Sequence, residues 1–215
     1  ILHEEQIDIA NELKKLESAL EKTCIQTIFL EKRVAERLSE NDAAIFHTHL
    51  MILEDRSFIR KLQNQISNGH SAAYALEKTV AEYIEVFHNM QDPYLRERAT
   101  DMEDIGRRIL ANLVGETPDQ VLHLKHSSIL VARQILPSDM AALDNEQILA
   151  IVTEVGEKNA HAIIMAKSMG IPAIVAVRGA LKNIAPEDSL IVDGNTGRIY
   201  INPLETVKDE YHRLQ

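Results

Sequence analysis

The chain has 215 residues, of which 45% are hydrophobic and 26% are charged, and its formal net charge is −10. This length can bury the core of one large domain or of two smaller ones. The acidic balance argues against broad nucleic-acid binding, which requires a basic surface, but it permits a basic protein partner. No apolar run approaches the roughly 20 residues of a membrane span, so we expect no membrane insertion.

The cysteine content points to a reducing compartment. The one cysteine, Cys24, excludes an internal disulfide bond and is consistent with the cytoplasm. The chain begins at Ile1 without a signal peptide, so we expect an excised piece of a longer cytoplasmic polypeptide.

The 9 histidines do not have the spacing of a tight zinc site. His47 and His49 are two residues apart on a helical stretch, so they should point to different faces. His123 and His126 have no accompanying cluster of cysteines or carboxylates. We therefore expect no metal site.

Residues 1–116 have the pattern of a helical domain, because glycine is nearly absent and apolar residues recur at heptad-like spacing. A long first helix should end near residue 38, where a polar group breaks it and caps the next helix. The following helices are expected at about 43–55, 57–67, 72–88 and 94–113. Helices joined by short turns predict an all-α antiparallel bundle.

The pattern changes to an α/β domain at residues 117–207. Short runs rich in β-branched residues predict strands at 128–132, 148–152, 173–177, 190–192 and 198–201, the last two joined by a hairpin turn. Helices near 138–143 and 162–169 separate the earlier strands. A charged helix from about residue 203 should leave this domain, with residues 208–215 as the start of a linker helix.

The sequence also suggests roles for His161 and for the acidic pair Asp101 and Asp104. A polar turn delivers His161 to the first turn of the expected helix, where the partial positive charge favours anions. Neutral imidazole is a good nucleophile, so His161 is well placed to carry a phosphoryl group. Asp101 and Asp104 are expected on a solvated helix face, where they could pair with Arg98 or Arg108.

The segment 156–175 resembles the phosphohistidine segment of phosphotransferases that use phosphoenolpyruvate. The residues that match are His161, Ile164, Ala166, Ile171, Pro172 and Ala173. Alone, this motif fits Enzyme I of the bacterial sugar phosphotransferase system, pyruvate phosphate dikinase and phosphoenolpyruvate synthase alike.

Two helical segments make the resemblance specific. Residues 44–55 and 92–108 resemble segments of the helical domain with which Enzyme I docks the phosphocarrier HPr. Three motifs in the same order therefore make the chain similar to the N-terminal, HPr-binding and phosphohistidine region of Enzyme I. The resemblance implies a helical HPr-binding domain at 1–116 and a swivelling-type α/β phosphohistidine domain at 117–207.

The resemblance also implies roles for individual residues. His161 would take phosphate that comes from phosphoenolpyruvate and pass it to the histidine of HPr or of an HPr-like carrier of the nitrogen-related branch. Gly156, Asn159 and Lys167 would support it. The implied carrier-binding face consists of Ala44, Met51, Ile52, Asp55, Phe58, Tyr94, Leu95 and Arg98. The neighbours Met51 and Ile52 cannot both face the bundle core, so at least one should be exposed.

The resemblance implies that further parts of the enzyme lie outside this chain. Phosphoenolpyruvate and Mg²⁺ would bind in a separate C-terminal barrel, so we expect no cofactor in this fragment and no use of phosphoenolpyruvate by the fragment alone. A strand segment that precedes the helical domain in the family, and that completes the α/β domain, is also absent.

The chain departs from the family pattern around His161. Glu157 replaces a glycine, Asn159 and Ala160 replace a threonine and a serine, Lys167 replaces an arginine, and Leu136 replaces a threonine. Lysine cannot grip a phosphate with two parallel hydrogen bonds as arginine can. The alternative interpretation is therefore a degenerate, carrier-binding regulatory module without phosphoryl transfer. A third, the swivelling domain of a dikinase, is disfavoured by the helical motifs.

Overall fold

The computed structural model describes residues 7–116, 126–143 and 146–214. The chain divides into two compact units, residues 1–120 and 121–215. The predicted boundary between residues 116 and 117 borders a stretch, 117–125, outside the described residues. In the described part of the chain, no helix combines the length and the apolar character needed to cross a membrane.

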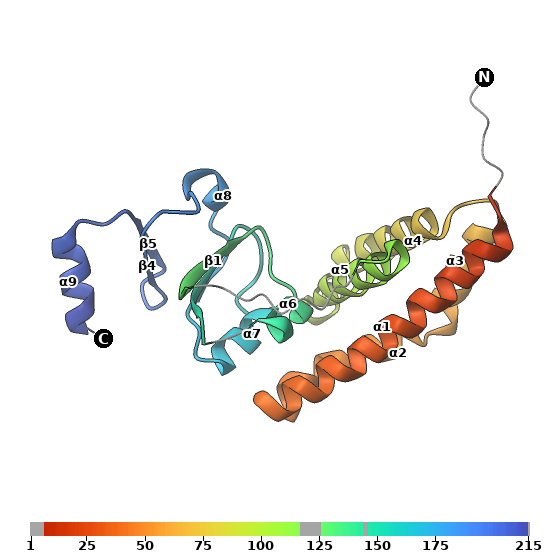
Figure 1. Ribbon diagram of the computed structural model, residues 1–215, viewed down its shortest axis with the longest axis horizontal. Coiled ribbons are helices and arrows are strands. Elements are labelled where there is room, and N and C mark those ends of the chain that lie inside the picture. The colour runs from red at the N-terminus through yellow and green to blue at the C-terminus, as the bar shows by residue number, and fades with distance from the viewer. Residues whose placement is uncertain (1–6, 117–125, 144–145, 215) are drawn as a thin grey trace, which may run out of the picture. The chain divides into compact units, whose positions relative to one another are not determined.

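The first unit is an all-α bundle, as the sequence predicts (Figure 1). Its helices are α1 (Ile9–Arg37), α2 (Glu40–Leu53), α3 (Arg56–Ser67), α4 (Ala72–His88) and α5 (Pro93–Val114). Helix α1 packs along α2 and α5, and α4 packs against α3 and α5. The shared core includes Leu16 of α1, Phe58 of α3, Leu76 of α4 and Ile105 of α5.

Local caps fix where these helices begin. The hydroxyl of Ser39 accepts a hydrogen bond from the backbone N–H of Asp42 at 3.1 Å, so α2 begins at Glu40, earlier than the predicted residue 43. The carboxylate of Asp55 caps α3 in the same way, accepting from the N–H of Phe58 at 2.8 Å. Helix α5 ends at Gly115, whose φ of 78° is the left-handed conformation typical of a glycine at this position.

The second unit is built on a small parallel sheet. Strands β1 (Ser128–Ala132), β2 (Ile148–Thr153) and β3 (Ala173–Ile174) pair in the order β1-β2-β3. Strand β3 is shorter than the predicted 173–177, because Ala176 adopts a positive φ of 60° that ends the extended conformation. Helices α6 (Pro137–Ala142) and α7 (His161–Ser168) connect the strands and pack against each other.

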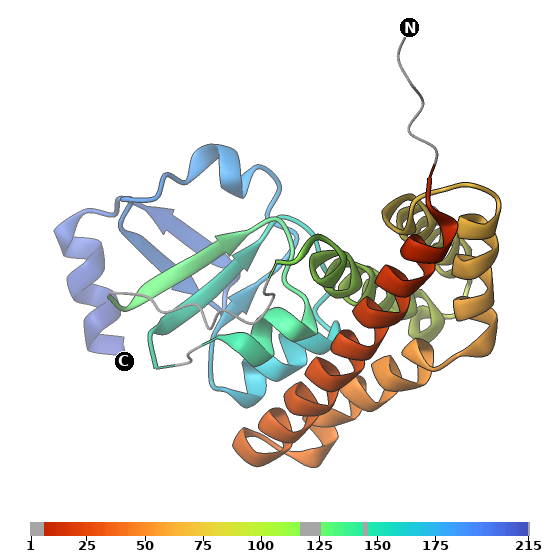
Figure 2. The same cartoon turned by 45° about the vertical axis from the view of Figure 1, so that its right-hand side comes forward.

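Both connecting helices lie on the same face of this sheet (Figure 2). This placement follows from two successive crossovers between neighbouring parallel strands, which are right-handed in nearly all proteins. Ile151 and Val152 of β2 and Met165 and Ala166 of α7 are buried in the resulting core. The strands therefore present their carboxyl ends at one edge, where α/β proteins usually place their ligands.

The chain closes with a hairpin and a helix. Strands β4 (Leu190–Asp193) and β5 (Arg198–Ile201) pair antiparallel, and α8 (Ala180–Asn183) precedes them. Helix α9 (Glu205–Leu214) follows, close to the predicted start at residue 203. The hydroxyl of Tyr211 on α9 donates to the carboxylate of Asp193 at 3.0 Å, so α9 is tied to the hairpin turn.

Candidate phosphohistidine site and docking face

His161 lies in the first turn of α7, as predicted, although the helix begins at His161 itself, one residue before the predicted 162. The residue before it, Ala160, has non-helical backbone, and its carbonyl accepts from the N–H groups of Ile163 and Ile164 at 2.9 and 3.0 Å. Alanine has no side-chain oxygen with which to cap the helix, so α7 carries no side-chain cap at this end. The half-buried imidazole therefore stands at a helix N-terminus, where the helix dipole favours a phosphoryl group.

The loop that leads to His161 is held against the sheet. Its first N–H groups, those of Glu154 and Val155, donate to the carbonyls of Ala132 and Arg133 at 3.1 and 2.9 Å. Gly156 then has a φ of 130°, which side-chain-bearing residues rarely adopt. Gly156 would therefore support His161 through its backbone, because it allows a conformation of the loop before α7 that other residues rarely adopt.

The other predicted supporting residues surround the same loop. Asn159 is exposed in it, two residues before His161. Lys167, near the end of α7, reaches back so that its ammonium donates to the carbonyl of Lys158 at 3.4 Å. The ammonium therefore stands beside the loop, and it supplies one point charge where an arginine would supply a fork of donors.

Leu136 replaces the hydroxyl that the family places near the histidine. It is the buried N-cap residue of α6, and its own N–H donates to the carboxylate of Asp139 at 2.9 Å. Because α6 packs against α7, this end of α6 belongs to the same layer as His161. Leucine has no hydroxyl with which to orient an imidazole, so any orientation of the ring must come from other groups.

The predicted carrier-binding residues lie on α2, α3 and α5. Ala44, Met51, Tyr94 and Leu95 are exposed, Met51 with 64% of its surface accessible. Its neighbour Ile52 is partly buried against the core, which confirms that the two cannot face inward equally. Asp55 is exposed and caps α3.

Phe58 differs from this prediction. Its side chain is 1% accessible, lies in the bundle core and makes an edge-to-face contact with Tyr83 at 5.8 Å between ring centroids. Position 58 lies on the same side of α3 as the buried Leu62 and Ile66, which are four and eight residues later. Phe58 therefore supports the bundle from within and does not belong to the exposed face.

The prediction that Asp101 and Asp104 lie on a solvated helix face is wrong. Both carboxylates are buried, not solvated. The expected ion pairs do form, Arg98 to Asp101 at 3.5 Å and Arg108 to Asp104 at 3.3 Å. The burial has a signal in the sequence, because Asp101 and Asp104 recur with Ile105 at helical spacing on the core face of α5.

The structure tests the prediction for His47 and His49 but not the one for His123 and His126. His47 is 69% accessible in its side chain and His49 is 0% accessible, so the two point to different faces as predicted. His123 lies outside the described residues, so the expectation that it and His126 form no metal site stays a prediction. Among the described residues, no three histidine, cysteine or acidic side chains gather as a metal site would require.

Comparison with known families covers both units. The model for the N-terminal region of PEP-utilising enzymes matches residues 2–98, and the model for the mobile domain of these enzymes matches residues 124–197. The implied docking face lies within the first match and His161 within the second.

Individual relatives agree with these families. The phosphoenolpyruvate-protein phosphotransferases of Listeria monocytogenes and Staphylococcus carnosus are 32% and 33% identical to the chain, over 98% and 97% of its length. The chain spans only 37% of the length of each.

Two solved structures are also similar. A solution structure of Enzyme I is 31% identical, with a TM-score of 0.73, and the match covers 97% of this chain and 86% of that one. The N-terminal domain of Enzyme 1-Nitrogen is 29% identical, with a TM-score of 0.60, over 97% of this chain and 85% of that one. The likeness therefore extends over the bundle and the α/β unit together.

Proposed function

Because the chain belongs to the Enzyme I family of phosphoenolpyruvate–protein phosphotransferases, we propose that it carries the phosphoryl group of such an enzyme on His161 and hands it to an HPr-type carrier. The observation that carries this proposal is the position of His161 at the N-terminus of α7, behind a loop fixed by Gly156. The α/β unit would be the swivelling phosphohistidine domain, residues 117–207, and the bundle, residues 1–116, the carrier dock.

The proposed chemistry is a pair of displacements at phosphorus. A ring nitrogen of His161 attacks the donor phosphoryl group, and the phosphorus–oxygen bond to the enol oxygen of phosphoenolpyruvate breaks. A ring nitrogen of the carrier histidine then attacks the same phosphorus, and the bond to His161 breaks, which restores the imidazole. The N–H groups of the first turn of α7 and the ammonium of Lys167 would stabilise the transferring oxygens.

The remaining parts of the reaction belong to the length of the relatives that this chain does not cover. We infer that phosphoenolpyruvate and Mg²⁺ bind to that further part of the enzyme. We also propose that the whole enzyme acts in the cytoplasm. The described residues offer no set of three metal ligands, so no step in this chain is assigned to the metal. The docking face, now without Phe58, would receive the carrier through apolar anchors such as Met51 and Tyr94, surrounded by charged residues.

Phosphoryl exchange with a phosphorylated carrier tests this proposal without phosphoenolpyruvate. The chain, its His161→Ala variant and its His126→Ala variant are mixed with phosphorylated HPr, and the loss of carrier phosphohistidine is followed after quenching at neutral pH. His126 is an exposed histidine of the same unit and provides the matched control. Exchange in the unaltered chain and in His126→Ala, but not in His161→Ala, supports the proposal. Carrier binding without exchange would instead indicate a regulatory module.

A further inference from the structure

Arg98 is held on several sides although it lies at the surface of α5. One guanidinium nitrogen donates to the hydroxyl of Tyr94 at 3.0 Å, and the guanidinium carbon lies 5.2 Å from the centre of the Tyr94 ring. Another guanidinium nitrogen lies 3.5 Å from Oδ2 of Asp101. The side chain is 22% accessible, so part of it still faces solvent. These contacts define one orientation for a side chain that is usually flexible on a surface.

Asp101 is itself fixed from behind. Its other oxygen, Oδ1, lies 3.4 Å from Nε2 of the buried His49 on α2. Nδ1 of His49 lies 3.0 Å from a guanidinium nitrogen of Arg108. Because a guanidinium can only donate, Nδ1 is the acceptor, so the neutral ring carries its proton on Nε2 and donates it to Asp101.

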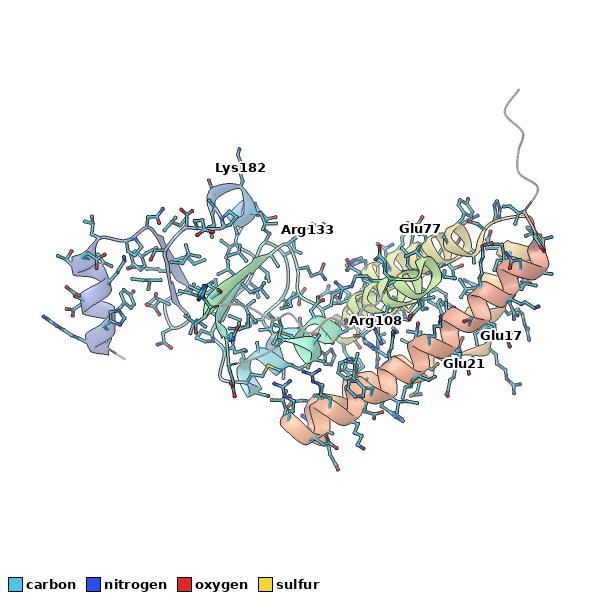
Figure 3. The ribbon with its side chains drawn as sticks, viewed as in Figure 1. Glu17, Glu21, Glu77, Arg108, Arg133 and Lys182 are labelled. Carbon is cyan, nitrogen blue, oxygen red and sulfur yellow. The ribbon has the colours of Figure 1, made fainter. Side chains whose placement is uncertain are left out.

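The contacts run from Arg98 through Asp101 and His49 to Arg108, which is buried in the bundle and labelled in Figure 3. It donates to the hydroxyl of Thr27 on α1 at 2.7 Å and pairs with Asp104 at 3.3 Å. Three helices thus support the Asp101 carboxylate, with α1 and α2 contributing Thr27 and His49 to α5. The buried carboxylate has His49 beside Oδ1 and the Arg98 guanidinium beside Oδ2, so it has little freedom to reorient.

We propose that Asp101 is a positioning residue for carrier docking, which holds Arg98 against Tyr94 so that the guanidinium meets a carboxylate or carbonyl oxygen of the carrier. This inference rests on the proposed function. A side chain ordered before binding loses less conformational entropy in the complex, and arginine directs several donors at an oxygen acceptor. In a chain with a net charge of −10, a fixed cation on the docking face also sets the orientation of a partner whose other contacts are basic.

A double-mutant cycle tests the inference through the affinity for unphosphorylated HPr, measured by calorimetry. We expect Arg98→Gln and Asp101→Asn each to weaken binding by about five- to twentyfold, as for one charge-assisted interface contact. The double variant should bind no more weakly than Arg98→Gln alone, because Asp101 acts through Arg98. Glu103→Gln, which changes a carboxylate of α5 that makes none of these contacts, is the control and should leave the affinity within about twofold.

The outcomes separate this inference from the proposed function. Equal affinities of the unaltered chain and Asp101→Asn would overturn the inference alone, as would fully additive losses in the cycle. If the folded, unaltered chain bound no carrier, the docking face and the inference would fail together.

Two further measurements keep the inference testable if Asp101→Asn does not fold. Arg98→Lys retains the charge at an accessible position but cannot reach Tyr94 and Asp101 together, so it should lose affinity as Arg98→Gln does. An unchanged affinity would overturn the inference. Without any carrier, nitrogen relaxation of the Arg98 side chain should show an ordered Nε–H group in the unaltered chain, and a mobile one would also overturn it.

Discussion

Gly106 of α5 faces Val80 of α4 so closely that a Cβ atom built on the glycine would lie 2.9 and 3.0 Å from the two methyl carbons of the valine. Both residues lie in the part of the bundle where α4 and α5 pack together. The glycine, which is otherwise unfavourable inside a helix, is therefore required by the close approach of its neighbour.

Gly106→Ala should consequently destabilise the bundle. Overpacking typically costs about 1–3 kcal/mol and alanine regains about 0.5–1 kcal/mol of helix propensity, so we expect a net loss of about 1 kcal/mol. Val80→Ala in the same chain should relieve the clash, with a coupling of at least about 1 kcal/mol in the double variant. Urea unfolding of the four chains measures this. An unchanged or higher stability of Gly106→Ala would show that the helices separate freely.

Glu12 ties α1 to the start of α4. Its carboxylate accepts from the backbone N–H of Ala72 and from the ammonium of Lys15, both at 2.7 Å. The bond from Lys15, followed by that from Ala72, holds the pKa of Glu12 below its ordinary value. The stabilisation is therefore complete above the ordinary glutamate pKa and is lost as the pH falls through the lowered value.

Glu12→Gln should lower the free energy of unfolding by about 1 kcal/mol at neutral pH, because the charge at the N-terminus of α4 disappears. The difference between the two chains should shrink on acidification. Lys15→Ala removes the exposed partner only and should have a smaller effect. An equal loss in the two variants would mean that the bond between Glu12 and Ala72 adds little to the stability of the bundle.

Lys167 should limit the rate of transfer, not the affinity for the carrier. Replacing it with arginine offers a phosphate two parallel hydrogen bonds, and we expect about a fivefold faster exchange with phosphorylated HPr. Lys208→Arg, on α9, is the control for a change of the same kind elsewhere. A change in carrier affinity with an unaltered rate would place Lys167 in docking.

The hairpin and α9 should separate in acid. Hydrogen bonds from Thr196, and further bonds from Tyr211 and Asn195, hold the pKa of Asp193 below its ordinary value. The bonds therefore persist at neutral pH and weaken as the pH falls below about 3.9 and through the lowered value.

Tyr211→Phe should release α9 at neutral pH while the turn, whose N–H groups donate to Asp193, stays formed. Amide exchange of α9 and of β4–β5 distinguishes the two effects. Protection of α9 that is unchanged in Tyr211→Phe would mean that other contacts hold the helix.

The elements were predictable from the sequence because their signals are local. Ser39, Asp55 and Ser71 each accept a hydrogen bond from an N–H group three residues later, so the caps are visible in a short window. The place of His161 near the start of α7 followed from a different local signal, the polar turn that precedes it, because Ala160 supplies no side-chain cap.

The spacing along α5 indicates that Asp101 and Asp104 lie on its core face, but it does not reveal that His49 of α2 contacts Asp101. His49 and Asp101 are 52 residues apart in the sequence, and each alone has the composition of a surface position. Only the packing of α2 against α5 makes their burial favourable. The expectation that Phe58 lies on the exposed carrier-binding face differs from the structure for a related reason. A motif gives the residue type but not the side of α3 on which the core lies.

Mapping the modified residue tests most directly whether His161 carries the phosphoryl group. The chain is incubated with phosphorylated HPr, its intact mass is measured under non-acidic conditions, and the phosphorylated peptide is sequenced. We expect a gain of one phosphoryl group on His161. A phosphoryl group on another histidine, or none in a folded chain that binds the carrier, would contradict the proposed role of His161.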